Sequence, residues 1–320
     1  MATIHDVAKK AGVAPITVSR VINNTGYVSE QMRTKVNKAI DECGYVPNVL
    51  ARSLKSKRTN TLALVFTDIT NPFFNFLARG VEDSASIAGF NVIFCNTDES
   101  QEQEDQYIQL MLQKQVDGIL LVPAESDSQS IKLIHEQKTP LVIVDRRVPS
   151  ETVDIVRCDS EGGAYQMTQY LINLGHERIA FLSGPQKVST AQDRVMGYKR
   201  AMESHGLERF INFQFGKFTT KSGAEQLKSV FSGKEQPTAI FAANNLIAIG
   251  ALLALREMDI RVPEDVAVVC FDSIPEYLTA IPFLTAVNQP SYEMGKKATE
   301  LLISRISNRG HVPQDYQEII

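Results

Sequence analysis

The sequence predicts a small N-terminal all-α helix-turn-helix domain followed by a large α/β body of two doubly wound parallel-sheet lobes. Three observations support this fold class: helical apolar spacing in the first 44 residues, a change in the sign of the charge near residue 60, and alternating strand-like and helix-like segments beyond it. At 320 residues, 43% of them hydrophobic, the chain is long enough for two or three domains with well-packed cores.

The N-terminal segment is expected to form three short helices. The first carries apolar residues at helical spacing, namely Ile4, Val7, Ala8 and Ala11. Thr3 would cap this helix, and Gly12 suits the left-handed turn that follows it. The second helix begins at Pro15, a residue favoured at the first helical position. A third would run from about Ser29 to Cys43 and complete a small core.

Two short helices joined by a glycine-bearing turn form a helix-turn-helix, whose second helix enters the major groove of DNA. Residues 1–60 carry ten basic and four acidic side chains, a net charge of +6, whereas the remainder of the chain carries −10. A basic end on an acidic body is expected when only that end contacts phosphates. The alternative is an ordinary helical hairpin whose exposed residues have no such role.

The body is predicted from alternating strands and helices. Apolar strand-like runs occur at Leu62–Phe66, Val92–Cys95, Gly118–Val122, Leu141–Val144, Ile179–Leu182, Ala239–Ala242 and Val266–Phe271. Helical patterns occur at Phe74–Ala88, Gln103–Lys114, Gly163–Leu174, Arg194–Ser204, Ser222–Phe231, Leu246–Met258 and Tyr292–Ser307. Such strands between amphipathic helices indicate parallel sheets covered on both faces. The lobes would divide near Asp159–Gly162 and be crossed again near Thr285–Pro290.

A ligand cleft is expected at the carboxyl ends of the strands, between the lobes. The polar and aromatic candidates that follow the strands are Asp68, Phe73, Phe74, Thr190, Arg194, Asn244 and Asp272. Arginine, asparagine and aspartate supply planar donors and acceptors for sugar hydroxyl pairs, and phenylalanine supplies an apolar face. Two alternatives stay open: Asp68, Asn244 and Asp272 as caps or turn residues, and the two phenylalanines as core.

The strings TIHDVAKKAGVAPITVSRVINN, GYVSEQMRTKV and GYVPNVLARSLKSKRTNTLAL closely resemble the lac and galactose repressor family of bacterial transcription regulators. The resemblance implies a DNA-binding head with its hinge at 1–58, the hinge being about 47–58, and a periplasmic-binding-protein-like effector-binding and dimerisation body at 60–320. It implies DNA contacts by Pro15, Ile16, Thr17, Ser19, Arg20 and Asn23, and in the hinge by Asn48, Ala51, Leu54 and Lys55. It also places Phe73, Phe74, Thr190, Arg194, Asn244 and Asp272 at the effector site.

The sequence departs from the family pattern in several places. Ala14 stands where the family often has serine, which removes a helix cap. Asn245 and Ser273 stand where aspartates are common, which makes the polarity of the ligand harder to infer. The chain is also expected to stop short of the closing strand and tail of the family.

The predicted function is a repressor of carbohydrate-metabolism genes. A homodimer would bind a near-palindromic double-stranded DNA operator, and a small sugar-like effector would control that binding. The alternative is a catabolite-type regulator whose body senses a protein co-regulator. We expect no enzyme activity, cofactor or metal site, because the sequence has no catalytic or metal-ligand motif and its four cysteines are widely spaced. The absence of a signal-peptide core or a long apolar run predicts a cytoplasmic protein with no membrane partner.

Overall fold

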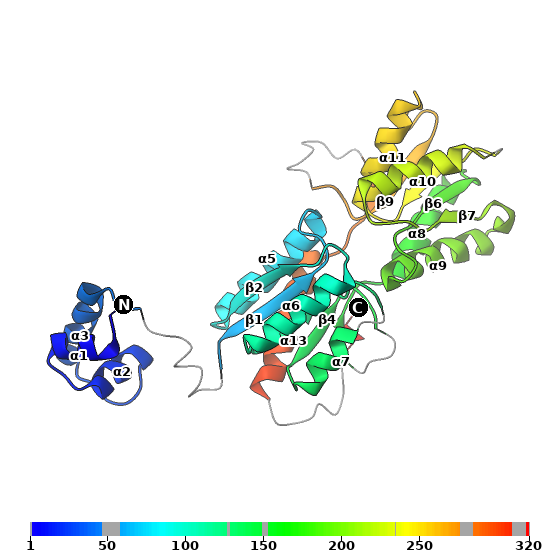
Figure 1. Cartoon of the computed structure of the whole chain (residues 1–320). Helices are drawn as coiled ribbons and strands as arrows, with labels where there is room; N and C mark the ends of the chain where they lie inside the picture. Colours follow the sequence, from blue (N-terminus) through cyan, green and yellow to red (C-terminus); the bar gives the residue numbers. More distant parts are fainter. Residues whose placement is uncertain are drawn as a thin grey trace. The chain divides into compact units, whose positions relative to one another are not determined.

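The computed structural model describes residues 2–46, 58–126, 129–148, 153–233, 235–275 and 284–308, and the backbone of Glu318–Ile319. By its internal contacts the chain divides into two compact units, Met1–Thr59 and Asn60–Ile320. The predicted hinge contacts Asn48, Ala51, Leu54 and Lys55 lie outside the described residues. Figure 1 shows the elements of each unit.

The N-terminal unit has the three predicted helices: α1 (Ile4–Ala11), α2 (Pro15–Asn23) and α3 (Glu30–Cys43). The Thr3 hydroxyl accepts a hydrogen bond from the Asp6 backbone N–H, and the Asp6 carboxylate accepts one in return from the Thr3 N–H at 2.8 Å. Gly12 ends α1 with φ of +64°, a conformation that favours glycine. Ala14 precedes α2 and supplies no side-chain cap, as expected from its methyl group.

The three helices pack around a miniature core. Its buried residues are Val7, Ala8, Ala11, Val18, Val21, Val36 and Ala39. An ion pair between Lys10 and Glu42, 3.0 Å long, also joins α1 to α3. The opposite face of α2 is open, with Ile16 58% exposed. Helix α2 therefore packs one face against this core and leaves the other face exposed.

The first lobe of the body is built on a six-stranded sheet of order β11-β5-β4-β3-β1-β2, in which the neighbouring strands run parallel. The strands are β1 (Thr61–Phe66), β2 (Asn91–Asn96), β3 (Gly118–Leu121), β4 (Leu141–Val144), β5 (Asp154–Val156) and β11 (Glu318–Ile319). The helices are α5 (Pro72–Ile87), α6 (Gln101–Gln113), α7 (Gln129–Glu136) and α13 (Ser291–Ser307). Alternate residues of β1 face opposite cores: Leu64 packs with α5 and α13, and Val65 with α6 and α7.

The second lobe has a five-stranded parallel sheet of order β10-β9-β8-β6-β7. The strands are β6 (Ile179–Leu182), β7 (Asn212–Gln214), β8 (Ala239–Ala242), β9 (Ala267–Phe271) and β10 (Thr285–Val287). The helices are α8 (Ser160–Asn173), α9 (Ser189–Ser204), α10 (Thr220–Phe231) and α11 (Asn245–Glu257), with a short 3-10 turn at Glu208–Phe210. In this lobe α8 packs against α9 and α10 against α11 (Figure 1).

The chain crosses between the lobes where the sequence predicted. β5 belongs to the first sheet and α8 to the second core, and after β10 the last helix α13 returns to the first lobe. The packing of α13 against α5 in the first lobe requires two glycines. An added Cβ at Gly295 would lie 2.1 Å from the Leu77 carbonyl oxygen, and one at Gly80 would lie 2.1 Å from that of Tyr292. Helices α5 and α13 therefore approach more closely than any side chain there would allow.

The predicted strands and helices of the body are all present, with boundaries shifted by up to five residues. The sequence analysis missed α7 and the three-residue strands β5, β7 and β10, whose runs are too short to give a period. The expectation that the chain stops short of a closing strand is wrong, because Glu318–Ile319 pair with β5 at the edge of the first sheet. Among the described residues, none of the helices combines the length and apolar character that crossing a bilayer requires.

Candidate functional site

A pocket in the body is lined by residues that follow strands of both sheets, and it encloses about 370 Å³ including its open mouth. Its lining residues are Asp68, Asn71, Phe73, Phe74, Glu99, Asp145, Arg146, Thr190, Arg194, Phe218, Asn244, Asp272 and Gln289. The structure thus brings together all six residues that the sequence analysis assigned to an effector site. Carboxyl ends of parallel strands converge at one edge of a sheet, so residues far apart in sequence meet there.

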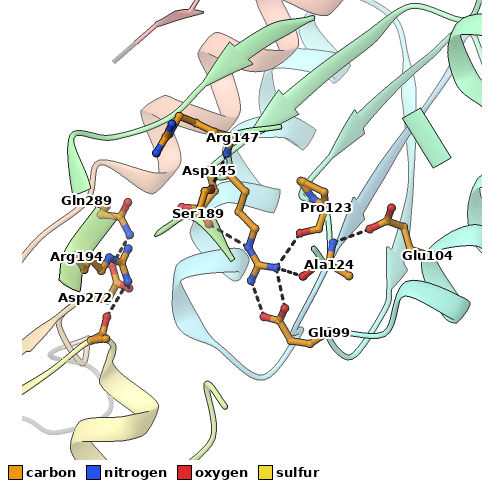
Figure 2. Close-up of polar contacts among 12 residues, drawn as sticks. Glu99, Glu104, Pro123, Ala124, Asp145, Arg147, Ser189, Arg194, Asp272 and Gln289 are labelled. Carbon is orange, nitrogen blue, oxygen red and sulfur yellow. Dashed lines mark hydrogen bonds and ion pairs between the residues drawn. The ribbon is translucent and has the colours of Figure 1, made fainter. Parts of the chain in front are cut away.

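Arg146, which follows β4, is the most completely held cation of the pocket. Its side chain is 2% exposed, and its two terminal nitrogens bind the two carboxylate oxygens of Glu99 at 2.6 and 2.7 Å. Nη1 also donates to the carbonyl oxygens of Pro123 and Ala124 at 2.8 and 3.0 Å. Glu104 fixes that turn by accepting from the Ala124 N–H at 2.6 Å, and Figure 2 shows these groups converging.

Arg194, on α9, is fixed by other residues of the second lobe. Nη1 donates to the Ala243 carbonyl oxygen at 2.7 Å and lies 3.9 Å from the Asp272 carboxylate. Its guanidinium carbon stacks 3.8 Å above the centre of the Phe271 ring. Asp272 has φ of +64° and accepts a hydrogen bond from Gln289 at 2.7 Å, so its carboxylate is fixed from both sides (Figure 2).

The polar atoms at this site are only partly satisfied. Among the described residues, Nε of Arg146, Nε of Arg194 and Oε1 of Gln289 are buried without a hydrogen-bond partner. Leaving a buried donor or acceptor unpaired costs about 1–3 kcal/mol, so such atoms in one pocket indicate a ligand or ordered water that completes them.

Burial dominates the electrostatics of the pocket carboxylates. It raises the pKa of Asp145 to about 6, although Arg146 and Arg194 act in the opposite direction. It also raises the pKa of Asp272, against the effects of Arg194 and of the hydrogen bond from Gln289. Burial disfavours the charged form of Arg146, but Glu99, Asp145 and Glu104 together outweigh it, and the pKa of that guanidinium is raised.

The alternatives left open by the sequence prove compatible with the pocket. Asn244 caps α11 by accepting from the Ile247 N–H at 2.9 Å, and Asp68 forms a turn by accepting from the Thr70 N–H at 2.8 Å. Phe73 and Phe74 belong to the core of the first lobe and contact each other edge to face, with ring centroids 5.0 Å apart. Each of these side chains also lines the pocket.

The sequence analysis missed Asn71, Glu99, Asp145, Arg146, Phe218 and Gln289. A signal was available for Asp145 and Arg146, since they directly follow the apolar strand Leu141–Val144 as Asp272 follows its strand. Glu99 and Phe218 come from turns after β2 and β7, where no residue pattern distinguishes a lining side chain from a solvated one.

Polar contacts join the two lobes beside the pocket. The Arg147 guanidinium forms an ion pair with Asp193 of α9, and the Arg147 N–H donates to the Ser189 hydroxyl at 2.8 Å. Lys187 and Glu125 form a second, more exposed ion pair of 3.0 Å.

In the N-terminal unit, the six predicted DNA contacts lie on α2. Arg20 is exposed like Ile16, and Pro15, Thr17, Ser19 and Asn23 are half-buried. The Asn23 amide donates to the Ser19 hydroxyl at 3.2 Å, so these two side chains restrain each other.

The four cysteines and His176 occupy positions that favour a structural role over a chemical one. Cys95 and Cys270 are buried, all four cysteines carry free thiols, and burial raises the pKa of Cys158 and Cys270 to about 12. A thiol with so high a pKa is unreactive at neutral pH. The ring of His176 lies 3.0 Å from the Thr238 hydroxyl and has a structural partner there.

Comparisons with known proteins agree with this architecture. Residues 3–48 match the family described as bacterial regulatory proteins, lacI family, and residues 59–318 match periplasmic binding proteins and sugar binding domain of LacI family. The chain is 37% identical over 309 residues to the ribose operon repressor of Escherichia coli (strain K12), covering 96% of this chain and 94% of the relative. It is 38% identical over 315 residues to the HTH-type transcriptional repressor PurR of Vibrio atlanticus (strain LGP32), with 97% and 94% covered.

A crystal structure of the lac repressor dimer bound to operator and the anti-inducer ONPF is similar over 99% of this chain and 96% of that one, with a TM-score of 0.85 and 25% identity. The two family matches together span nearly the whole sequence, and the relatives extend along it at well over 30% identity. The chain therefore belongs to the LacI family of bacterial regulatory proteins.

Proposed function

We propose that this protein is a transcriptional repressor whose binding to operator DNA is controlled by a monosaccharide in the pocket. Members of the family are DNA-binding transcriptional regulators that respond to small-molecule effectors, and this chain is such a regulator. The observation that carries the proposal is the set of buried, unpaired atoms on Arg146, Arg194 and Gln289, which lie among the residues that line one pocket.

The chemistry of the lining favours a sugar. Guanidinium, carboxylate and carboxamide groups are planar and present pairs of donors or acceptors, which match the hydroxyl pairs of a sugar ring. Phe73, Phe74 and Phe218 supply apolar surface for its C–H groups. One of the relatives is the ribose operon repressor of Escherichia coli, and ribose is a monosaccharide, which supports one ring over two.

The DNA-binding role is proposed for the exposed face of α2. Arg20 can bond O6 and N7 of guanine together, and Ile16 can contact a thymine methyl group. Thr17, Ser19 and Asn23 would bind neighbouring bases or phosphates. Two copies of the head in a homodimer would bind the half-sites of a near-palindromic operator, about one helical turn apart or less.

The ligand would act by its differential affinity for the arrangements of the two lobes. Because residues of both lobes line the pocket, a sugar bound there stabilises the arrangement that lets all of them reach it. That change would alter the population of dimers able to bind DNA. A small ligand is favoured over a protein co-regulator because the unpaired atoms are buried in the pocket and not on an open face.

The test combines operator selection with ligand screening of the full-length protein. Genomic fragments bound by the protein would be sequenced, and purified protein would be screened by thermal shift against aldopentoses, aldohexoses, disaccharides and purine bases. We expect an operator with twofold symmetry and stabilisation by one or a few monosaccharides, since a ligand that binds the folded state raises its melting temperature. Stabilisation by a purine base alone, or by no small molecule, would contradict the sugar assignment.

A further inference from the structure

We infer that the pocket selects an uncharged sugar over its phosphorylated or acidic derivatives, and that Glu99 is the residue that enforces this selection. The inference rests on the proposed function, because it concerns the ligand of the same pocket. It follows from which hydrogen-bonding positions of the two buried arginines are already occupied by the protein.

Most hydrogen-bonding positions of Arg146 are already occupied by acceptors of the protein. Nη1 carries two hydrogens and already has three acceptors within 3.0 Å, one of them Glu99. Nη2 donates to the second oxygen of Glu99 at 2.6 Å. Glu99 occupies the face of the guanidinium formed by its two terminal nitrogens, so an anion would have to bind at the other face, formed by Nε and the second hydrogen of Nη2. The carboxylate of Asp145 lies 3.8 Å from that Nε and would repel an anion there. Within the described residues, the buried nitrogen without a hydrogen bond is Nε, which suits a single hydroxyl oxygen.

Arg194 is compensated in the same manner by the second lobe. Nη1 donates to the Ala243 carbonyl oxygen, the carboxylate of Asp272 lies 3.9 Å away, and Phe271 covers one face of the guanidinium. Its unpaired atom in the described part of the chain is again Nε. Each buried arginine therefore has a protein carboxylate as counter-ion and a buried Nε that can donate to a neutral oxygen.

The carboxylates of the lining outnumber the arginines. Asp68 and Asp145 line the pocket in addition to Glu99 and Asp272, so four acids face two guanidinium groups. A bound phosphate would lie close to this excess negative charge in a site of low dielectric constant, where like charges repel strongly. Hydroxyl groups avoid that cost, and they can donate hydrogen bonds to the same carboxylates.

Glu99 is the determinant to test, because neutralising it removes the counter-ion of Arg146 while the Arg146 side chain stays in place. The backbone carbonyl oxygens of Pro123 and Ala124 still hold Nη1, and Glu104 still holds the turn that carries them. Glu99 itself is 27% exposed on its side chain, with φ of +57°, in the turn before α6. Its neutral isostere leaves Arg146 with a buried charge that lacks its bidentate counter-ion, which is the arrangement that anions bind.

The experiment is isothermal titration of the full-length protein with D-ribose, D-glucose, ribose 5-phosphate, glucose 6-phosphate and adenine. Wild type, Glu99→Gln and the control Glu125→Gln would be compared, since Glu125 is an acid of the same lobe that forms an ion pair with Lys187 and does not line the pocket. We expect wild type and the control to favour a neutral sugar over its phosphate by on the order of 100-fold. In Glu99→Gln this ratio should fall by about tenfold, through tighter binding of the phosphate.

The outcomes separate the inference from the proposed function. If wild type binds a sugar phosphate as tightly as the neutral sugar, the charge selection is wrong while the sugar-binding function stands. If the ratio is the same in Glu99→Gln and Glu125→Gln, Glu99 is not its determinant. If adenine binds and none of the sugars does, the proposed function itself is wrong. Circular dichroism and the wild-type melting temperature would identify a variant that has lost its fold.

Discussion

Arg147 of the first lobe and Asp193 of the second form an ion pair that joins the lobes beside the pocket. Nε of Arg147 lies 3.3 Å from the carboxylate of Asp193, which is only 8% exposed, and Arg157 approaches the same carboxylate at 3.9 Å. Neither Arg147 nor Asp193 lines the pocket, so the pair stabilises one arrangement of the lobes independently of the ligand.

Asp193→Asn is expected to weaken effector binding severalfold without altering the pocket. A ligand that needs the lobes close together binds with an affinity reduced by the fraction of molecules in that arrangement. Titration of the effector gives the affinity, and small-angle scattering of the ligand-free protein gives the separation of the lobes. The control is Lys187→Gln, which removes a more exposed pair expected to contribute about 1 kcal/mol or less. Equal affinity in Asp193→Asn and wild type would show that the pair does not hold the lobes.

Asp272→Asn should abolish most of the response to the effector while leaving operator affinity intact. Asparagine tolerates the φ of +64° at this position better than alanine does, so the substitution removes the charge with little backbone strain. The loss of a hydrogen bond to a charged group is expected to weaken effector binding by about 1.5–3 kcal/mol. Titration and a gel-shift assay with and without effector measure the two quantities. Asp265→Asn, at an exposed pair with Arg261 in the same lobe, should behave as wild type.

The sequence predicted the head and most of the body because their signals are local. Gly12, Pro15 and the apolar spacing of the first helix each specify one feature of a helix-turn-helix, and the structure shows all of them. Seven strands were predicted because each has an apolar run of four or more residues; six of them are buried on both faces, and β2, at the edge of its sheet, is partly exposed. The three-residue strands β5 and β7 were missed since partner strands, and not their own residues, determine them.

About half of the pocket residues could be predicted from the sequence. The other half could not, because long-range contacts and not local patterns place them. Arg194 and Asp272 stand in family motifs and follow strands. Glu99 lines the pocket because a turn with positive φ directs it to Arg146, 47 residues away. Such a long-range pairing between two common residue types leaves no pattern in a single sequence.

Asp145→Asn should remove a dependence of stability on pH that wild type shows. Burial raises the pKa of Asp145 from 3.8 to about 6. Between these two pKa values the folded protein holds the proton more tightly than the unfolded chain does. The carboxyl group therefore contributes its full stabilisation below about pH 4, and this contribution to the free energy of unfolding, about 3 kcal/mol, is lost as the pH rises through 6. Urea unfolding from about pH 4.5 to about pH 7.5 should therefore show wild type losing stability relative to the variant. A constant difference between the two proteins would contradict the raised pKa.

The effector should bind more weakly as the pH falls through 6. Arg146, Arg194, Asp272 and Glu99 surround Asp145, and a sugar hydroxyl that donates to the ionised carboxylate favours its charged form. Titration of the effector at the same pH values, in wild type and Asp145→Asn, measures this linkage.

Arg20→Ala is expected to weaken binding to the specific operator by about 1–3 kcal/mol and binding to random duplex DNA by much less. The reason is that a bidentate bond to guanine distinguishes base pairs, whereas charge neutralisation does not. Fluorescence anisotropy at fixed salt with both duplexes gives the two affinities. Arg33→Ala, on α3, removes the same charge and should lower both affinities equally. If Arg20→Ala also lowers both equally, Arg20 binds phosphate and not a base.

Gly295→Ala should destabilise the body by about 1–3 kcal/mol, because an added methyl group in a close-packed contact forces the backbones apart. The new Cβ would lie 2.1 Å from the Leu77 carbonyl oxygen and 3.1 Å from the Val81 nitrogen, both backbone atoms that cannot turn aside. Helix α13 would have to move away from α5 and uncover Met294, Ala298 and Leu302 of the first-lobe core. Urea unfolding of the variant and of the control Gly233→Ala, where the nearest atom to the added Cβ is 3.4 Å away, measures the cost. If both variants unfold at the wild-type midpoint, the close contact of α13 with α5 does not limit the stability of the first lobe.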